Sequence, residues 1–312
     1  MNRISNHYIR YSVRLEEINR MAKEDPKTLI QETEAVFRQS VAEIAESVVT
    51  HHKKIIMLAG PSCAGKTTTA HLLAEHLRQR GVGTVSVSLD DFFLGEGKAP
   101  RLENGRFDYE SPYALDLPQM SRCLSELAEK NASELPIFDF EKSRPAPEKR
   151  SVRLQKEDVV VVEGIHALNP LVLENLPQER LLKLYSSVKQ GISDLRGEVL
   201  TAQDIRLIRR VVRDHYHRGR SAEKTLEVWM DVCRGEELYI QPFKRGADLT
   251  VNSLHLYEPC VFREEAEVLF ATMPEEARNL PQVEKIRRAL ELFAPIGEEM
   301  VPEDSLLQEF LS

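Results

Sequence analysis

Two patterns of apolar and polar residues alternate through the middle of the chain, and they predict alternating strands and helices. Short apolar runs, such as the four valines at 159–162, are typical of strands buried on both faces. Segments with apolar residues three or four positions apart predict helices. The candidate strands are 55–59, 84–88, 135–138, 158–163, 181–187 and 247–252, and the candidate helices are 66–80, 113–130, 201–216 and 221–235. Because the two types alternate, we expect an α/β fold with a parallel sheet that helices cover on both faces.

The pattern weakens in two segments and changes at both ends of the chain. Residues 91–112 and 140–151 contain glycine, proline and charged residues, and we expect both to be long surface loops. Residues 27–49 predict one amphipathic helix before the first strand, and a further helix is expected around 281–294. We therefore divide the chain into a helical N-terminal extension (1–50), a central domain (51–255) and a small C-terminal extension (256–312).

The composition narrows the class of protein. Of the 312 residues, 42% are hydrophobic and 29% are charged, as in an ordinary globular protein. A net charge of −8 argues against a nucleic-acid-binding surface, which needs a basic patch. No apolar run reaches the ~20 residues that span a bilayer, and residues 1–7 lack the apolar core of a secretory signal. The cysteines lie far apart and form no C-x-x-C pair, which fits a reduced, cytoplasmic protein.

One motif carries most of the predicted chemistry. Residues 60–67 match the phosphate-binding pattern G-x-x-x-x-G-K-[ST], directly between a predicted strand and a predicted helix. The two glycines let successive backbone N–H groups point at a phosphate, and the helix N-terminus adds its positive end. The lysine supplies a charge for the outer phosphates of ATP, and the threonine hydroxyl can bind Mg2+. The predicted ATP-binding residues of this segment are Gly60, Pro61, Ser62, Cys63, Ala64, Gly65, Lys66, Thr67 and Thr68.

Two acidic residues follow predicted strands at the edge where this loop is expected. Asp90 comes just after strand 84–88, where a carboxylate can accept the proton of an attacking hydroxyl or hold Mg2+ through water. The alternative is that Asp90 and Asp91 are simply aspartates of a turn. Glu163 ends the four-valine strand, at the position of the acidic metal-binding residue of phosphate-loop enzymes. The alternative for Glu163 is a helix-capping residue.

A basic helix contrasts with the acidic balance of the whole chain. Its arginines lie three or four positions apart, so they share one face or neighbouring faces of the helix. Clustered guanidinium groups suit ligands with several phosphates and the charge that develops in phosphoryl transfer. The alternative is a solvated helix whose arginines pair with glutamates. The arginines concerned are Arg206, Arg209, Arg210 and Arg213, followed by Arg218 and Arg220.

Segments 106–112 and 136–140 combine aromatic residues with an aspartate near the expected binding edge. Aromatic rings can enclose a planar base, and an aspartate can accept hydrogen bonds from two sugar hydroxyls. Taken singly, each segment could instead be an edge of the core. The chain has no N-K-x-D motif for reading guanine, which argues against a GTPase.

In their order along the chain, these motifs resemble the uridine kinase and phosphoribulokinase family of phosphate-loop kinases. The chain shows G-x4-G-K-T, D-D-F-F, F-D near a proline, P-I-F-D-F, V-E-G-I and R-L-x-R-R-x-x-R-D with R-G-R, all within 53–255. Segments 252–257 and 305–311 also resemble a bacterial uridine-kinase-like branch. The resemblance implies a phosphate-loop NTPase fold and ATP-dependent kinase activity. Oligomers differ between branches of the family, so a homo-oligomer is left open.

The resemblance also implies roles for individual residues. Asp90 would be the base that faces the substrate hydroxyl, Asp108 would bind ribose hydroxyls, and Glu163 would act at the metal with Thr67. Phe138 and Phe140 would flank the base of the substrate. The remaining implied roles are catalysis for Lys66, Arg210 and Arg213, substrate binding for Arg210, and ATP binding from a mobile lid for Arg218 and Arg220.

The chain departs from the uridine kinases where those enzymes read the base. Phe93 and Phe138 stand where tyrosine is usual, Ser143 replaces a histidine, and Val228 replaces a glutamine. A phenylalanine cannot hydrogen-bond the edge of a base, so the nucleobase preference is open. The loop after Asp108 is also slightly longer than in the family.

Together these features predict an ATP- and Mg2+-dependent kinase of a small alcohol, and they favour a nucleoside 5′-hydroxyl as the acceptor. Within the same class, the acceptor could be a phosphorylated sugar or pantothenate. A nucleotide-binding regulatory module that has lost catalysis, or an ATPase that drives a partner, would have no acceptor, and the retained Asp90 argues against both. We expect no nucleic-acid partner and no membrane partner.

Overall fold

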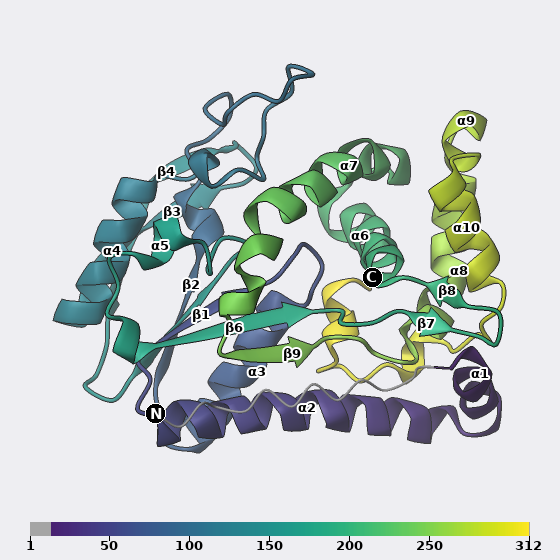
Figure 1. Ribbon diagram of the computed structural model, residues 1–312, viewed down its shortest axis with the longest axis horizontal. Coiled ribbons are helices and arrows are strands. Elements are labelled where there is room, and N and C mark those ends of the chain that lie inside the picture. The colour runs from purple at the N-terminus through teal and green to yellow at the C-terminus, as the bar shows by residue number, and fades with distance from the viewer. Residues whose placement is uncertain (1–13, 312) are drawn as a thin grey trace.

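The computed structural model describes residues 14–311, and its centre is a parallel sheet of five strands (Figure 1). The strand order across the sheet is β2-β5-β1-β6-β9. The central strand β1 pairs with β5 on one side and with β6 on the other. The segment after β1 therefore leaves the sheet at the edge where the carboxyl ends of its neighbours also lie. The strands are β1 (Ile55–Ala59), β2 (Thr84–Ser88), β5 (Val159–Glu163), β6 (Leu181–Ser187) and β9 (Leu249–Asn252).

Helices cover both faces of this sheet, which confirms the predicted α/β phosphate-loop architecture. Along β1, Ile56 and Leu58 point into one apolar cluster, which α2 and α3 share. Ile55 and Met57 point into a second cluster, which α4 and α5 share. Neighbouring residues of a strand face opposite sides, so a doubly covered strand needs an unbroken apolar run. The helices are α2 (Pro26–Thr50), α3 (Lys66–Gln79), α4 (Leu117–Lys130), α5 (Pro170–Leu173), α6 (Ala202–Arg218) and α7 (Ala222–Tyr239).

The prediction of a surface loop at 140–151 is wrong. Arg144–Arg153 forms strand β4, which pairs antiparallel with β3 (Ala132–Asp139). The predicted strand 135–138 lies within β3, so it belongs to this hairpin and not to the parallel sheet. Nearly all of β4 is exposed and therefore lacks an apolar pattern. Pro145 and Pro147 are tolerated because each strand of a two-stranded hairpin has an unpaired edge.

The other long loop was predicted correctly. Residues 94–111 are irregular apart from an isolated bridge between Arg101 and Phe107. Short 3-10 turns bound this segment on both sides. These turns are η1 (Leu89–Phe92) and η2 (Pro112–Ala114).

Both extensions, and the segment of the central domain that follows β6, contain more structure than the sequence predicted. The predicted helix 27–49 corresponds to α2, but α1 before it was missed because only three of its residues are buried and apolar. The predicted helix around 281–294 is α10, and α8 before it was missed, as was the hairpin of β7 and β8. None of the described helices has the length and apolar character needed to cross a bilayer. The prediction about residues 1–7 lies outside the described residues. The added elements are α1 (Leu15–Glu24), β7 (Ile192–Ser193), β8 (Glu198–Leu200), α8 (Glu258–Ala271), α9 (Glu275–Arg278) and α10 (Pro281–Leu290).

The two extensions share one core with the sheet. Leu306, Leu307 and Phe310 lie in and beside the short turn η6 (Leu306–Glu309), and all three are fully buried. They belong to the same apolar cluster as residues of α2 and α3. The end of the described chain therefore packs into the centre of the molecule.

A buried arginine on α6 joins four segments of this core. Arg209 has no solvent exposure, and its guanidinium donates to both carboxylate oxygens of Glu258 at 2.6 and 2.8 Å. It also donates to the backbone oxygens of Cys63 at 3.0 Å and Ser253 at 2.6 Å. The ring of Phe310 lies 5.2 Å from the guanidinium carbon. Such a charge is tolerated in a core only when its donors are satisfied and its charge is paired.

The change Glu258→Gln tests how far the fold depends on this pair. It leaves the charge of Arg209 buried without a counter-charge, so we expect a loss of about 3–5 kcal/mol in the free energy of unfolding. The measurement is urea denaturation at neutral pH. The control is Glu284→Gln, which breaks the exposed pair between Glu284 and Arg288 and should cost less than about 1 kcal/mol. Equal losses in the two variants would contradict a structural role for Arg209.

Candidate active site

The loop at 60–67 joins the end of β1 to the start of α3 and has the tight shape that the motif requires. A Cβ atom on Gly60 would lie 2.2 Å from the backbone oxygen of Ser186, so no side chain fits there. Gly65 and Cys63 both have positive φ, +69° and +59°. Successive residues of this kind curl the backbone so that its N–H groups point into one concavity. The Lys66 side chain folds back over the loop, with Nζ donating to the Pro61 oxygen at 3.2 Å.

The N-terminal end of α3 completes this concavity. The first N–H groups of a helix have no acceptor within the helix, and they carry the positive end of its dipole. Thr67 is exposed there, and Thr68 is partly buried. Arg210 reaches the loop from α6 and donates to the Ser62 hydroxyl oxygen at 2.8 Å. The structure thus brings the loop residues and Arg210 together.

Two carboxylates follow on the same side of β1: Glu163 ends β5, the neighbour of β1, and Asp90 lies just after β2, the next strand out. Ser88 and Glu163 are paired neighbours on β2 and β5, and the Ser88 hydroxyl donates to Glu163 Oε1 at 2.8 Å. Asp90 follows in the turn after β2. Burial raises the pKa of Glu163, while the Lys66 ammonium lowers it and the Asp90 charge raises it. Lys66, Asp90 and Glu163 are therefore close enough to act on one another electrostatically.

The Asp90 side chain is accessible to solvent, but many protein atoms lie close to its carboxylate. Its side chain is exposed, yet desolvation within the concave site raises its pKa above the usual value. Lys66, Arg218 and Arg213 oppose this shift, and Asp91 adds to it. A carboxylate that is accessible and has a raised pKa is a stronger base than an ordinary aspartate, which suits the acceptance of a proton.

Four arginines at the end of α6 lie close to one buried aspartate, Asp214. Both carboxylate oxygens of Asp214 face guanidinium groups, and its side chain is fully buried. The Thr225 hydroxyl from α7 also donates to it, at 3.3 Å. The sequence analysis quoted this aspartate within the motif but gave it no role. The four arginines, with their distances to Asp214, are Arg210 (3.5 Å), Arg213 (3.0 Å), Arg218 (3.6 Å) and Arg220 (3.8 Å).

Two other arginines of this helix serve the fold instead. Arg206 pairs with Glu236 of α7 at 2.6 Å and is almost completely buried. Arg209 is the core residue described above. Arg206 and Arg209 therefore pair with glutamates, which was the alternative to a role in phosphate binding. Both pairs are buried, whereas that alternative expected a solvated helix.

Asp108 is buried at the other side of the site and already has protein partners. Its Oδ2 accepts from Arg234 Nη1 at 3.4 Å and from the Tyr239 hydroxyl at 3.2 Å, both on α7. Sequence reasoning missed Arg234 and Tyr239, because no motif links them to residue 108. The carboxylate is thus held in place before any ligand binds.

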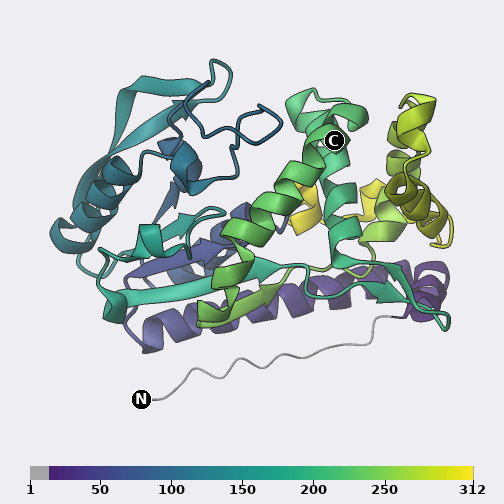
Figure 2. The ribbon, with the colours of Figure 1, turned by 45° about the horizontal axis from the view of Figure 1, so that its top comes forward.

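Three phenylalanines form a cluster between the turn after β2 and the hairpin. The rings of Phe93 and Phe138 lie 5.8 Å apart, and those of Phe138 and Phe140 lie 5.0 Å apart, edge to face. Asp91 fixes the hairpin to the turn by accepting from the Phe138 backbone N–H at 3.4 Å. Phe140 is 63% exposed, so it offers an apolar surface at the rim. Figure 2 shows this hairpin and the ends of α6 and α7 rising from the same side of the molecule, opposite α2.

Glu110 is a site residue that the motifs did not reveal. Burial raises its pKa to about 7, and the charges of Arg210, Asp90, Lys66 and Asp108 all act on it. Its Cβ packs against Gly235 of α7, where an added Cβ would lie 2.3 Å away. The only sequence signal was indirect, since Glu110 lies in the loop after Asp108 that is longer than in the family.

A separate cavity of about 450 Å3 borders the loop at Pro61. It lies between β6, β9, α6 and α7, whereas Asp90 and Glu163 follow β2 and β5 on the other side of β1. The cavity is therefore not the place where the predicted reacting groups meet. Its charged lining residues are Lys189, Arg206, Glu236, Glu237, Lys244 and Arg245.

Comparisons with known proteins identify the family to which the chain belongs. The model of the phosphoribulokinase / uridine kinase family matches residues 55–258. A uridine kinase from Lactobacillus helveticus is 28% identical over 63% of this chain and 85% of its own length, and one from Bacillus pumilus is 30% identical over the same shares. A solved structure from Silicibacter sp. TM1040, named as a kinase of a fructose transport system, has a TM-score of 0.50 and 17% identity over 67% of this chain and 98% of its own, which supports the fold alone. Because the family model matches about two thirds of the chain, the chain belongs to the phosphoribulokinase / uridine kinase family and is an ATP-dependent kinase.

Proposed function

We propose that the enzyme transfers the γ-phosphoryl group of ATP to a hydroxyl of a small molecule, with a nucleoside 5′-hydroxyl as the favoured acceptor. The observation that carries the proposal is the placement of the phosphate-binding loop, Glu163 and Asp90 at the carboxyl ends of three adjacent strands, β1, β5 and β2. Phosphoryl transfer needs little covalent chemistry from the protein, so catalysis rests on positioning and charge stabilisation. The uridine kinases among the relatives support a nucleoside as the acceptor.

The donor side is built by the loop and α3. The loop amides and Lys66 bind the phosphates, and Thr67 and Glu163 would hold Mg2+, which would offset the negative charge of the phosphates. Magnesium sites commonly use one or two protein groups together with substrate phosphates and water, so this small set of oxygens fits the ion. Arg210 and Arg213 offset the charge that spreads over the phosphoryl oxygens during transfer. Arg218 and Arg220, both partly exposed and close to Asp214, add positive charge to the same cluster.

The acceptor side is built by Asp90, Asp108 and the phenylalanine cluster. Asp90 orients the acceptor hydroxyl and takes its proton as the phosphoryl group arrives. Asp108 accepts hydrogen bonds from sugar hydroxyls, which replace its present hydrogen bonds with Arg234 and Tyr239. Phe138 and Phe140 provide apolar faces for a planar group.

A second candidate is another small alcohol, such as a phosphorylated sugar. Two observations favour it: the cluster of Phe93, Phe138 and Phe140 offers no hydrogen bond to a base edge, and Asp108 already has two partners. A panel of nucleosides, sugars, phosphorylated sugars and pantothenate separates the candidates. We expect ADP formation from Mg-ATP to rise with a nucleoside. A response to another compound alone would replace the nucleoside as the acceptor.

Asp90→Asn separates binding from chemistry. We expect kcat to fall by roughly 10²–10⁴-fold, as for loss of a general base, while ATP binding is retained. Lys66→Ala should weaken ATP binding and turnover together. The measurements are ADP formation and calorimetric titration with Mg-ATP, with the exposed Glu96→Gln as the control for a change of charge. If Asp90→Asn kept its turnover while Lys66→Ala lost it, the role of Asp90 as the base would be wrong.

Glu110→Gln should remove an ionisation near neutral pH. Burial raises the pKa of Glu110 to about 7, and the Asp90 charge adds to this shift. In the wild type this carboxyl therefore adds a negative charge to the site as the pH rises through about 7, whereas the Gln side chain stays neutral. The kcat/KM profile should be measured from about pH 5 to about pH 9, with Glu103→Gln in the same loop as the control, and the step near pH 7 should be missing only from Glu110→Gln. The same step in both variants would mean that Glu110 does not act on the reaction.

A further inference from the structure

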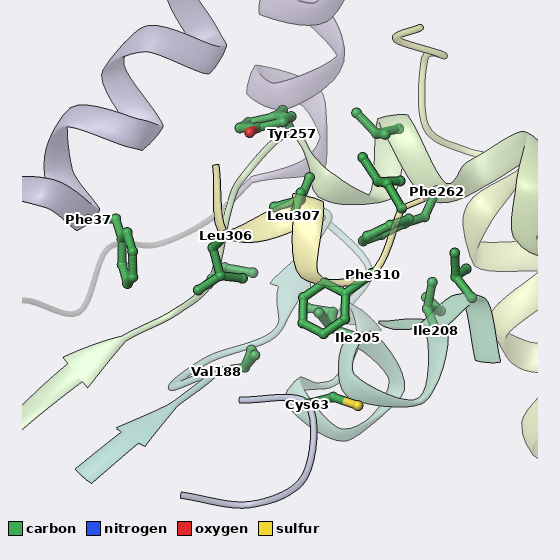
Figure 3. Packing of buried hydrophobic residues seen from close by; sticks show 14 of the residues in the cluster. Phe37, Cys63, Val188, Ile205, Ile208, Tyr257, Phe262, Leu306, Leu307 and Phe310 are labelled. Atoms are coloured by element: carbon green, nitrogen blue, oxygen red, sulfur yellow. The ribbon is translucent and has the colours of Figure 1, made fainter. Parts of the chain in front are cut away.

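The C-terminal segment, defined here as residues 305–311, lies directly against the phosphate-binding loop. Leu306 fills the space above Gly65, where an added Cβ would lie 2.3 Å from its Cδ1. The Thr68 hydroxyl donates to Glu309 Oε2 at 2.9 Å, across 241 positions of sequence. Figure 3 shows Phe310 with its ring among Cys63, Ile205 and Phe262. The segment thus contacts the loop and the first turn of α3.

This segment is anchored on both sides of Glu309. At its start, the Ser305 hydroxyl donates to Glu34 Oε1 at 2.5 Å, and Tyr257 donates to the same oxygen at 2.6 Å. At its end, the Leu311 backbone oxygen lies 2.7 Å from His217 Nε2. Three apolar side chains between these points are fully buried. Movement of the segment away from the core would expose these three side chains to water. We therefore expect the backbone of the segment to stay in place when a ligand binds.

The group that Glu309 holds belongs to the donor side of the site. Thr68 lies in the first turn of α3, where the amide and hydroxyl donors face the inner phosphates of a bound nucleotide. In a nucleotide the inner phosphate leads on to the sugar, so this end of the site is the one far from Asp90. The Glu309 carboxylate also acts on the metal-side residue, since it adds to the effect of burial in raising the pKa of Glu163. Through its hydrogen bond with Thr68, the carboxylate lies at the first turn of α3, next to the phosphate-binding loop.

We infer, on the basis of the proposed function, that Glu309 is a donor-site residue that competes with the inner phosphate of the nucleotide for Thr68 and weakens nucleotide binding. When a nucleotide binds, the Glu309 side chain gives up the Thr68 hydroxyl and turns away, while Leu306 and Phe310 stay in the core. The two negative groups repel each other at short range, where solvent screens them poorly. The inner phosphates are common to ATP and ADP, so both are weakened and release of ADP is faster.

The test is calorimetric titration of the full chain with Mg-ATP and with Mg-ADP. Glu309→Gln removes the charge and nearly preserves the shape, so we expect Kd to fall by about tenfold for both nucleotides. The matched control is Glu303→Gln, which makes the same change of charge at an exposed position two residues before the segment, and its Kd should stay unchanged. A Glu309→Gln variant that binds no tighter than the wild type, or binds more weakly, would overturn the inference.

A second comparison identifies the contact responsible. In a Thr68→Val background the contested hydroxyl is gone, so Glu309→Gln should give a clearly smaller gain than in the wild type. An equal gain in both backgrounds would show that Thr68 is not the contested group. Lys66→Ala tests the proposed donor site separately. Binding that depends on Lys66 but ignores Glu309 overturns only this inference, whereas no nucleotide binding by any variant overturns the proposed function as well.

Discussion

The bidentate pair between Arg209 and Glu258 is the interaction on which the geometry of the site depends. A guanidinium group has donors in a fixed plane, and Arg209 uses them on Glu258 and on the backbone oxygens of Cys63 and Ser253. Cys63 is in the phosphate loop, Ser253 follows β9, and Glu258 begins α8. One side chain thus fixes the loop to the far end of the sheet. The loop has strained positions, and such a shape persists only when its surroundings impose it.

The arginines of α6 therefore have two different roles, one in the core and one at the site. Their spacing in the sequence does not show which arginine has which role. Arg209 points into the core, while Arg210 and Arg213 reach the site and share Asp214 with Arg218 and Arg220. Four guanidinium groups so close together would repel one another, and the buried carboxylate offsets part of that repulsion before any phosphate is bound. Because Asp214 balances only part of the charge, the cluster keeps a net positive charge for the donor phosphates. The structural arginine holds the loop that receives those phosphates, and the arginines beside it supply the charge.

The sequence predicted what local chemistry determines. The apolar strands and the glycine loop follow rules that span a few residues, so the parallel sheet, its doubly covered faces and the fold class were correctly predicted. Contacts between distant segments were not predicted: the partners of Asp108 are more than a hundred positions away, and no motif marks them. Strand β4 was not predicted for a different reason. An exposed hairpin strand with prolines has no buried face, so its sequence shows no apolar pattern. The C-terminal segment was noted as a resemblance, but its place against the loop depends on packing that only the fold reveals.

The two halves of the site differ in how they are built, and this difference bears on substrate choice. The donor half stands on the sheet, α3, α6 and the buried C-terminal segment, so its atoms are fixed by the core. The acceptor half stands on the irregular segment 94–111 and on a hairpin whose second strand is almost entirely exposed. Changes in such segments cost little stability, because few buried contacts depend on them. Under the proposed function, a chain of this fold can therefore exchange the groups of its acceptor half, such as the phenylalanine cluster and Glu110, while Lys66, Asp90 and Glu163 stay in position for the transfer.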